Sequence, residues 1–136
     1  MSRENVEVVR QVYEAAGRGD AEAVFALYDE RVEWDVSRFP LGELMGGGIY
    51  YGHDGLREVF RVRNEPFGRI QDTVEELIDR GEDVLSVSTS YARGRSSGVD
   101  VTGAMYAVWT IRDGKVVRVV WHPSRSDALE AVGLSE

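Results

Sequence analysis

The chain has 136 residues, of which 43% are hydrophobic and 29% are charged, a composition typical of one soluble globular domain. Its 24 acidic residues outnumber 16 Lys and Arg, and the formal net charge of −8 repels nucleic acid and anionic membranes, so neither is expected as a partner. The absence of cysteine excludes disulfides and thiolate metal sites, and without an apolar leader or a run of about 18 apolar residues a cytoplasmic location is expected.

Helices are predicted in the first half of the chain. Over positions 3–16, apolar residues recur at three- and four-residue spacing, which is the pattern of an amphipathic helix. Asp20 is a suitable N-cap for a second helix whose buried side extends to Tyr28. A third helix is predicted over 54–63, with Phe60 turned inward.

Two further features lie before the third helix. Apolar and acidic residues alternate over 32–36, the period-two pattern of a half-buried strand. The segment 40–52 carries five glycines, so we interpret it as a flexible, lid-like loop with a short strand at 49–51.

From position 69 onward the pattern is that of a sheet. Runs of β-forming residues, separated by turn residues, cover 70–79, 84–95, 99–112 and 116–122. They predict an antiparallel meander, and a closing helix follows over 125–132. Because long strands twist and coil strongly, the sheet is expected to bend over the helices and enclose a cone.

Aromatic side chains with an apolar body and a polar tip are frequent, and such residues suit the wall of a ligand pocket. The alternative is that they are core and interface aromatics whose polar tips are satisfied. The residues expected to line the pocket are Trp34, Tyr51, Phe60, Trp109 and Trp121.

Strand parity assigns some of these residues to a face, because residues two apart share one side of a strand. The bulkier sets are assigned to the concave side, namely Val117, Val119 and Trp121 on one strand and Met105, Ala107, Trp109 and Ile111 on another. This assignment turns His122 away from the cone.

Asp35 is the best candidate for a general base, because it follows Trp34 on the first strand and desolvation beside that indole would strengthen it. The alternative is an exposed strand carboxylate. Tyr13 or His122 is expected to stabilise a developing oxyanion. The two histidines, His53 and His122, lie on different elements without further ligands at defined spacing, so no metal site is predicted.

A set of stretches carries a family resemblance. They are 5–10 with Tyr13 and Gly19-Asp20, then 32–34, 51–55, 108–116 and 128–134. Together they resemble the SnoaL-like family of the nuclear-transport-factor-like, or ketosteroid isomerase-like, superfamily. The resemblance implies one α+β domain over 1–136: a cone-shaped, curved antiparallel sheet with three N-terminal helices packed on its concave face, a cystatin-like α+β barrel. It also implies a homodimer formed through the sheet.

The resemblance carries function less well, because fold does not fix activity. The isomerase relatives use a carboxylate on the first strand, a tyrosine on the first helix and a protonated aspartate on a late strand. Asp35 lies within one residue of the first position, whereas Val12 and Ala107 occupy the others, which disfavours a steroid isomerase. The cyclase relatives rely on a carboxylate and a histidine, which Asp35 and His122 could supply. The Asp-Arg-Asp relay of the epoxide-hydrolase relatives is not found on inward-facing strand positions.

The sequence therefore predicts a small-molecule pocket protein that binds an apolar molecule, as an isomerase, cyclase or hydratase that needs no cofactor. Phosphate-binding loops, nucleophile elbows and dinucleotide fingerprints are absent from the sequence. A non-catalytic ligand-binding or dimerisation module of the same fold is the alternative. A third possibility is an interaction domain that works through Tyr106, Arg118 and Val120 on the outer sheet surface.

Overall fold

One curved sheet organises the molecule, which the computed structural model describes over residues 2–39 and 47–135. Its strands are β1 (Tyr28–Asp35), β2 (Ile49–Tyr51), β3 (Phe67–Arg80), β4 (Asp83–Gly94), β5 (Asp100–Arg112) and β6 (Lys115–His122). The order across the sheet is β2-β1-β6-β5-β4-β3. The predicted antiparallel meander forms from β3 to β6, while β1 runs parallel to β6, so the sheet is mixed at that pair.

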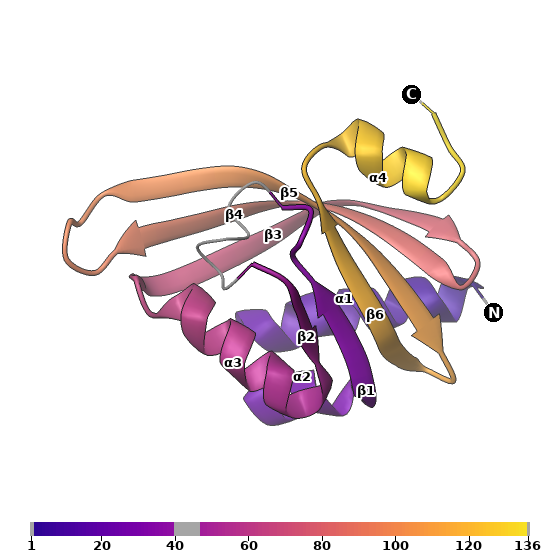
Figure 1. Ribbon diagram of the computed structural model, residues 1–136, viewed down its shortest axis with the longest axis horizontal. Helices are drawn as coiled ribbons and strands as arrows, with labels where there is room; N and C mark the ends of the chain where they lie inside the picture. Colours follow the sequence, from indigo (N-terminus) through magenta and orange to yellow (C-terminus); the bar gives the residue numbers. More distant parts are fainter. Residues whose placement is uncertain (1, 40–46, 136) are drawn as a thin grey trace.

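The helices cover the two faces of the sheet unequally. Three of them, α1 (Ser2–Gly17), α2 (Ala21–Ala26) and α3 (Gly52–Asn64), lie together on the concave face (Figure 1). The short α4 (Arg125–Ala131) lies on the opposite face. This arrangement confirms the predicted α+β cone with three N-terminal helices on its concave side.

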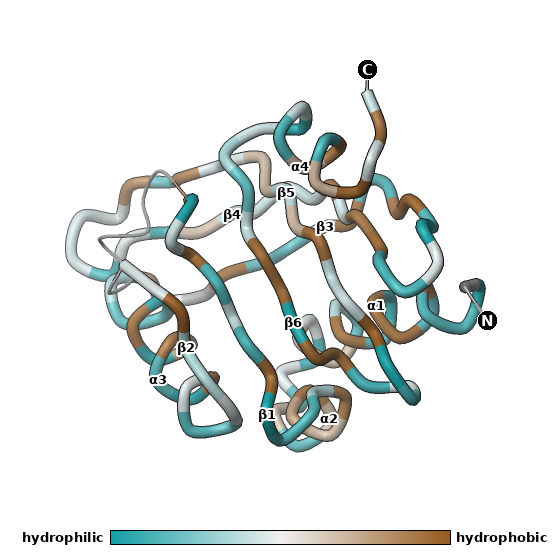
Figure 2. The backbone as a smooth tube through the Cα atoms, turned by 45° about the vertical axis from the view of Figure 1, so that its right-hand side comes forward, coloured by the Kyte–Doolittle hydropathy of each residue, from teal (hydrophilic) through white to brown (hydrophobic). Residues whose placement is uncertain are grey.

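Apolar burial explains why the sheet closes over these helices. Hydrophobic and hydrophilic positions alternate along α1 and α3 (Figure 2), and the hydrophobic ones, among them Val9 and Leu56, are fully buried against the sheet. From the sheet, Trp109, Ile111 and Val119 join the same core. A second, smaller cluster lies on the outer face beneath α4.

The second helix ends earlier than predicted. Asp20 caps it as expected, because its side chain accepts a hydrogen bond from the Ala23 amide at 3.1 Å. The chain then leaves the helix at Leu27, whose carbonyl accepts a hydrogen bond from Val116 at 2.9 Å, and Tyr28 already pairs with β6. Parallel pairing therefore starts the first strand four residues before the predicted one.

A bulge in β6 changes one predicted orientation. Thr110 pairs with Arg118 and Ile111 with Val116, so Val117 is an extra residue on that strand. Val116 takes the core position that parity had assigned to Val117, which is half-buried. Beyond the bulge the parity is as predicted, with Val119 and Trp121 in the main core.

Two other predictions concern the loop at 40–52 and membrane spans. Of the predicted lid-like loop at 40–52, positions 40–46 lie outside the described residues, and the short strand at 49–51 is present as β2. Among the helices that the structure describes, none has both the length and the apolarity of a membrane span.

The packing of α4 gives a test of the fold. Leu129 is 5% exposed and packs with Leu85 and Val108 of the outer cluster. Leu129→Ala should lower the free energy of unfolding by about 2–4 kcal/mol, because it removes buried methyl groups and leaves a cavity. Glu130→Ala, on the exposed side of the same helix, should change it by less than about 0.5 kcal/mol. Urea unfolding measures both, and equal effects would contradict this packing.

Candidate functional site

The concave side of the sheet is hollow near the ends of the helices. A cavity of about 640 Å³ lies between the turn that joins α1 to α2, the second half of α3 and the start of β3. Tyr13, Phe60 and Ile70 provide part of its apolar wall, and Arg63 and Asp72 provide charge. Its size is typical of small-molecule sites, and its wall combines apolar side chains with charged ones.

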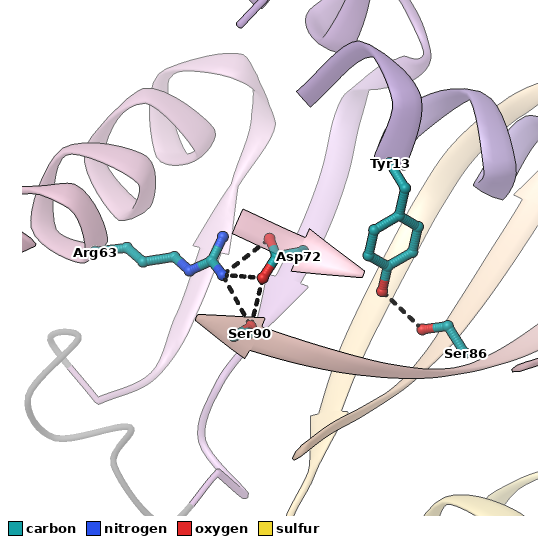
Figure 3. Close-up of polar contacts among 5 residues, drawn as sticks. All are labelled: Tyr13, Arg63, Asp72, Ser86 and Ser90. Carbon is teal, nitrogen blue, oxygen red and sulfur yellow. Dashed lines mark hydrogen bonds and ion pairs between the residues drawn. The ribbon is translucent and has the colours of Figure 1, made fainter. Parts of the chain in front are cut away.

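A carboxylate held by two donors stands at the wall of this cavity (Figure 3). Arg63, in the last turn of α3, directs Nη2 to both oxygens of Asp72 at 2.9 and 3.0 Å. Ser90 faces Asp72 across the β3/β4 ladder and donates its hydroxyl to the same carboxylate. The Arg63 and Asp72 side chains are 24% and 20% exposed, so the pair is sheltered without being sealed from a ligand.

A second hydrogen-bonded network lies next to the one around Asp72. The Tyr13 hydroxyl, from α1, is 3.0 Å from Ser86 Oγ on β4 (Figure 3), and Trp109 Nε1 donates to that same Oγ at 2.8 Å. An indole N–H can only donate, so Ser86 accepts from Trp109 and can use its own hydrogen toward Tyr13. In that arrangement the Tyr13 hydrogen is available to a ligand.

The two networks are coupled electrostatically at Tyr13. Burial raises the pKa of Tyr13 above the usual 10.0, and hydrogen bonds with Ser86 and Ser88 partly offset that rise. The negative charge of Asp72 raises this pKa further, and the positive charge of Arg63 lowers it. Tyr13 therefore stays a neutral hydrogen-bond donor across the physiological pH range.

The serines of β4 are functional candidates that the sequence reasoning missed. Ser86, Ser88 and Ser90 occur at every second position, and the hydrophobic residues of opposite parity, Leu85 and Val87, turn to the outer cluster. This alternation within a predicted strand was the signal that three hydroxyls share one face. It could not show that Asp72 and Tyr13 would meet them.

Asp35 and His122 lie on the other face of the sheet. Trp34 is in the inner core, so Asp35, the next residue along β1, points outward, and it pairs with Val120 of β6. His122 is two residues beyond Val120 and shares this face. The structure therefore does not bring Tyr13 together with Asp35 and His122.

The local contacts of these two residues are nevertheless specific. Asp35 is 5% exposed, and its carboxylate accepts hydrogen bonds from Ser37 N at 2.8 Å and Ser37 Oγ at 2.5 Å. Burial lowers the pKa of His122, and the nearby Arg38 lowers it further, whereas Asp127 and Asp35 act in the opposite direction. His122 is thus held in its neutral form near neutral pH.

The aromatic residues expected to line a pocket separate into four environments. Phe60 borders the large cavity, whereas Trp34 and Trp121 border a much smaller one of about 10 Å³, together with Arg63. Trp109 lies in the core and contacts the Tyr13 ring edge-on, with 5.6 Å between the ring centroids. Tyr51, on the edge strand β2, is 62% exposed. Within the described ranges, no group of three or more His, Cys, Asp or Glu is placed to hold a metal ion.

Solved structures of known proteins share this architecture. TerC, crystallised with polyporic acid, is 24% identical with a TM-score of 0.77, over 95% of this chain and 98% of that one. An NTF2-like protein of unknown function from Burkholderia pseudomallei is 25% identical with a TM-score of 0.77, over 96% and 98%. A Xanthomonas campestris protein whose description proposes a polyketide cyclase is 19% identical with a TM-score of 0.71, over 97% and 98%. No curated protein matches the chain.

These likenesses and the hollow cone define an NTF2-like α+β fold. The family within that fold follows from the sequence. The profile described as the SnoaL-like domain matches residues 9–119, which is most of the chain. The chain belongs to the SnoaL-like family.

The Ser86 hydroxyl should contribute to stability as well as to the site. Ser86→Ala leaves the buried Trp109 N–H without its acceptor, so we expect the free energy of unfolding to fall by about 1–3 kcal/mol. The exposed Ser96 provides a matched control, and Ser96→Ala should change it by less than about 0.5 kcal/mol. Denaturant unfolding measures both values. Wild-type stability in Ser86→Ala would show that this hydrogen bond does not form in solution.

The raised pKa of Tyr13 makes stability depend on alkaline pH. The folded protein keeps this proton to higher pH than the unfolded chain, so the stability it contributes is complete below about pH 10 and is lost as pH rises through the folded pKa. The free energy of unfolding should therefore fall more steeply above about pH 10 in the wild type than in Tyr13→Phe. Unfolding curves at a series of alkaline pH values measure the slopes. Tyr51→Phe, which alters an exposed tyrosine, serves as the control, and parallel slopes for wild type and Tyr13→Phe would contradict the burial effect.

Proposed function

We propose that this protein is an enzyme that performs general acid–base chemistry on a small carbonyl compound with an apolar body, bound in the cavity of about 640 Å³. Asp72 accepts a proton from the carbon next to the carbonyl, and the Tyr13 hydroxyl donates a hydrogen bond to the oxyanion that develops. The observation that carries the proposal is the Asp72 carboxylate, fixed by Arg63 and Ser90 at the wall of a cavity that Tyr13 also lines.

The geometry suits Asp72 to this role. A base must be held in one orientation, and three hydrogen bonds from Arg63 and Ser90 hold this carboxylate against β3. The oxygens still have lone pairs beyond those three bonds, since a carboxylate offers about four acceptor positions. A ligand in the cavity can therefore approach Asp72 without breaking the ion pair.

Tyr13 suits the second role for a different reason. A donor to an oxyanion must keep its proton, and the raised pKa of Tyr13 ensures that it does. The N–H of Trp109 polarises Ser86, and Ser86 in turn orients the tyrosine hydroxyl. As the negative charge develops, this chain of donors is already in place.

The neighbours lend support of a general kind. TerC was crystallised with polyporic acid, and the Xanthomonas campestris neighbour is described as a proposed polyketide cyclase. Both descriptions involve oxygen-rich organic molecules, which agrees with a carbonyl ligand. An isomerase or a cyclase that works through an enolate begins with the proton transfer proposed here, and a hydratase uses it in the direction of water loss.

Two competing assignments remain and have their own support. Asp35 and His122 stay candidates for catalysis at the outer face, because both are buried there. Asp35 is also fixed by hydrogen bonds from Ser37, and His122 interacts electrostatically with Asp35. A non-catalytic binding protein is favoured by the Arg63 contact, since Arg63 and Ser90 already occupy three acceptor positions of the Asp72 carboxylate. The proposal also includes a single domain over 1–136, a cytoplasmic location and a homodimer through the sheet.

Proton abstraction can be tested before the natural substrate is known. The ketone 2-tetralone, dissolved in D₂O with the protein, exchanges the hydrogens next to its carbonyl when a base removes them, and NMR follows the loss of their signal. Wild-type protein should accelerate this exchange, and Asp72→Asn should reduce the accelerated rate by about 100-fold or more. Glu130→Gln, an equivalent change on the exposed side of α4, is the matched control and should keep the wild-type rate.

The same assay separates the alternatives. Loss of exchange in Asp35→Asn, with Asp72→Asn unaffected, would move catalysis to the outer face. If 2-tetralone binds in the cavity of the wild type but does not exchange faster than in buffer, the binding protein is the better description. Tyr13→Phe should slow exchange while Asp72 keeps its ion pair, since it removes only the oxyanion donor.

A further inference from the structure

Two buried donors in the core have no acceptor. The indole Nε1 atoms of Trp34 and Trp121 are buried and, among the described residues, make no hydrogen bond. Their side chains are 4% and 7% exposed, so bulk water does not satisfy them either. Buried polar atoms in folded proteins are almost always paired, and an unpaired one calls for an unseen partner. Trp109, the remaining tryptophan, follows the rule through Ser86.

The two indoles belong to the same small cavity. The Trp34 and Trp121 rings are tilted by 44° relative to one another, with 5.5 Å between their centroids, and both line the cavity of about 10 Å³. A space of this size holds about one water molecule or one oxygen atom of a ligand. The remaining wall is apolar apart from Arg63.

Among the described residues that line this cavity, the polar side chains, Trp34, Trp121 and Arg63, are all donors. Indole and guanidinium groups carry N–H hydrogens and no acceptor lone pair, so an ammonium or another pure donor gains nothing there. A carbonyl, hydroxyl or oxyanion oxygen can accept from such groups. The positive charge of Arg63 favours an oxygen with negative character.

Arg63 also connects this cavity with the proposed site. It lines both the small cavity and the large one, and it holds Asp72 at the same time. A molecule seated beside Asp72 and Tyr13 therefore has the small cavity next to it along the Arg63 side chain. This placement makes the small cavity an extension of the site rather than a separate core defect.

From these observations we infer that Trp34 and Trp121 form an acceptor-oxygen subsite, which receives a second oxygen of the ligand, remote from the carbon that loses its proton. The inference rests on the proposed function for the position of the ligand. The ligand class is then an apolar molecule with at least two oxygens, one at Tyr13 and one at the indole pair. In the absence of ligand, one water occupies the subsite.

The indole N–H signals in a ¹⁵N–¹H NMR spectrum test this subsite directly. The probes are 2-tetralone and 6-hydroxy-2-tetralone, which differ by one oxygen on the ring remote from the ketone. Titration with 6-hydroxy-2-tetralone should move the Trp34 and Trp121 signals in the direction of stronger hydrogen bonding and leave the Trp109 signal nearly unchanged. Single Trp→Phe variants assign the three signals.

Affinity provides a second readout that does not depend on assignment. One net hydrogen bond should make 6-hydroxy-2-tetralone bind about 3- to 10-fold more tightly than 2-tetralone to the wild type. Trp34→Phe or Trp121→Phe should remove this advantage, so that the two probes bind the variant with nearly equal affinity. If either variant does not fold, the wild-type spectra with Trp109 as the internal reference decide the matter.

The outcomes separate the subsite from the proposed function. If both probes bind and exchange deuterium, but the added hydroxyl changes neither affinity nor the two indole signals, the subsite is overturned and the proposed function stands. If the hydroxyl improves affinity and moves both signals without any catalysed exchange, the subsite stands and the enzyme assignment fails. If neither probe binds, both are overturned.

Discussion

Alternation of side chains between the two faces of a curved sheet is the constraint on which the site depends. A strand residue faces either the helices or the outer surface, and a shift of one position reverses the choice. Asp72 and Ser90 pair with one another, so they share a face of the sheet, and that face is the concave one. Asp35 follows the inward-facing Trp34 and therefore faces outward. The chemistry available in the cavity is therefore decided by parity before any distance is considered.

Burial then decides how the inward polar groups are arranged. A polar group on the concave side is cut off from bulk water, so it needs a partner inside the cone. Ser86 provides one for Trp109 and Tyr13, and Arg63 provides one for Asp72. These contacts join α1 and α3 to β3 and β4, so the pairs that define the site also fix the helices on the sheet. The stability of the fold and the geometry of the candidate site rely on the same hydrogen bonds here.

The sequence was sufficient for the scaffold because the scaffold follows from local patterns. The helical stripe at 3–16, the Asp20 cap and the long β-type runs each depend on neighbours within a few residues. The start of β1 was missed because it depends on pairing with β6, about 90 residues further along the chain. The bulge at Val117 was missed because it depends on the register between β5 and β6. Local pattern contains no information on such pairing.

The site was harder to predict for the same reason. Tyr13 was recognised by its chemistry, but its partners Ser86 and Asp72 lie about 60 to 75 positions further along the chain, and only the folded sheet brings them together. Asp35 was the more obvious carboxylate, since it stands beside an aromatic residue in the sequence. Adjacent residues on a strand point in opposite directions, so that proximity in sequence was the wrong guide to the cavity.

Net charge shows the same limit, because it describes the chain and not the cavity. The chain carries −8, yet within the part of the chain that the structure describes four arginines and two aspartates line the large cavity. Arg57 and Arg61 pair with acids of α3 or the residue that follows it, and those acids do not line the cavity. The wall is therefore rich in guanidinium donors, and the two indoles add further donors at the small cavity that shares Arg63 with it. A ligand rich in acceptor oxygens complements this wall, although the protein as a whole repels polyanions.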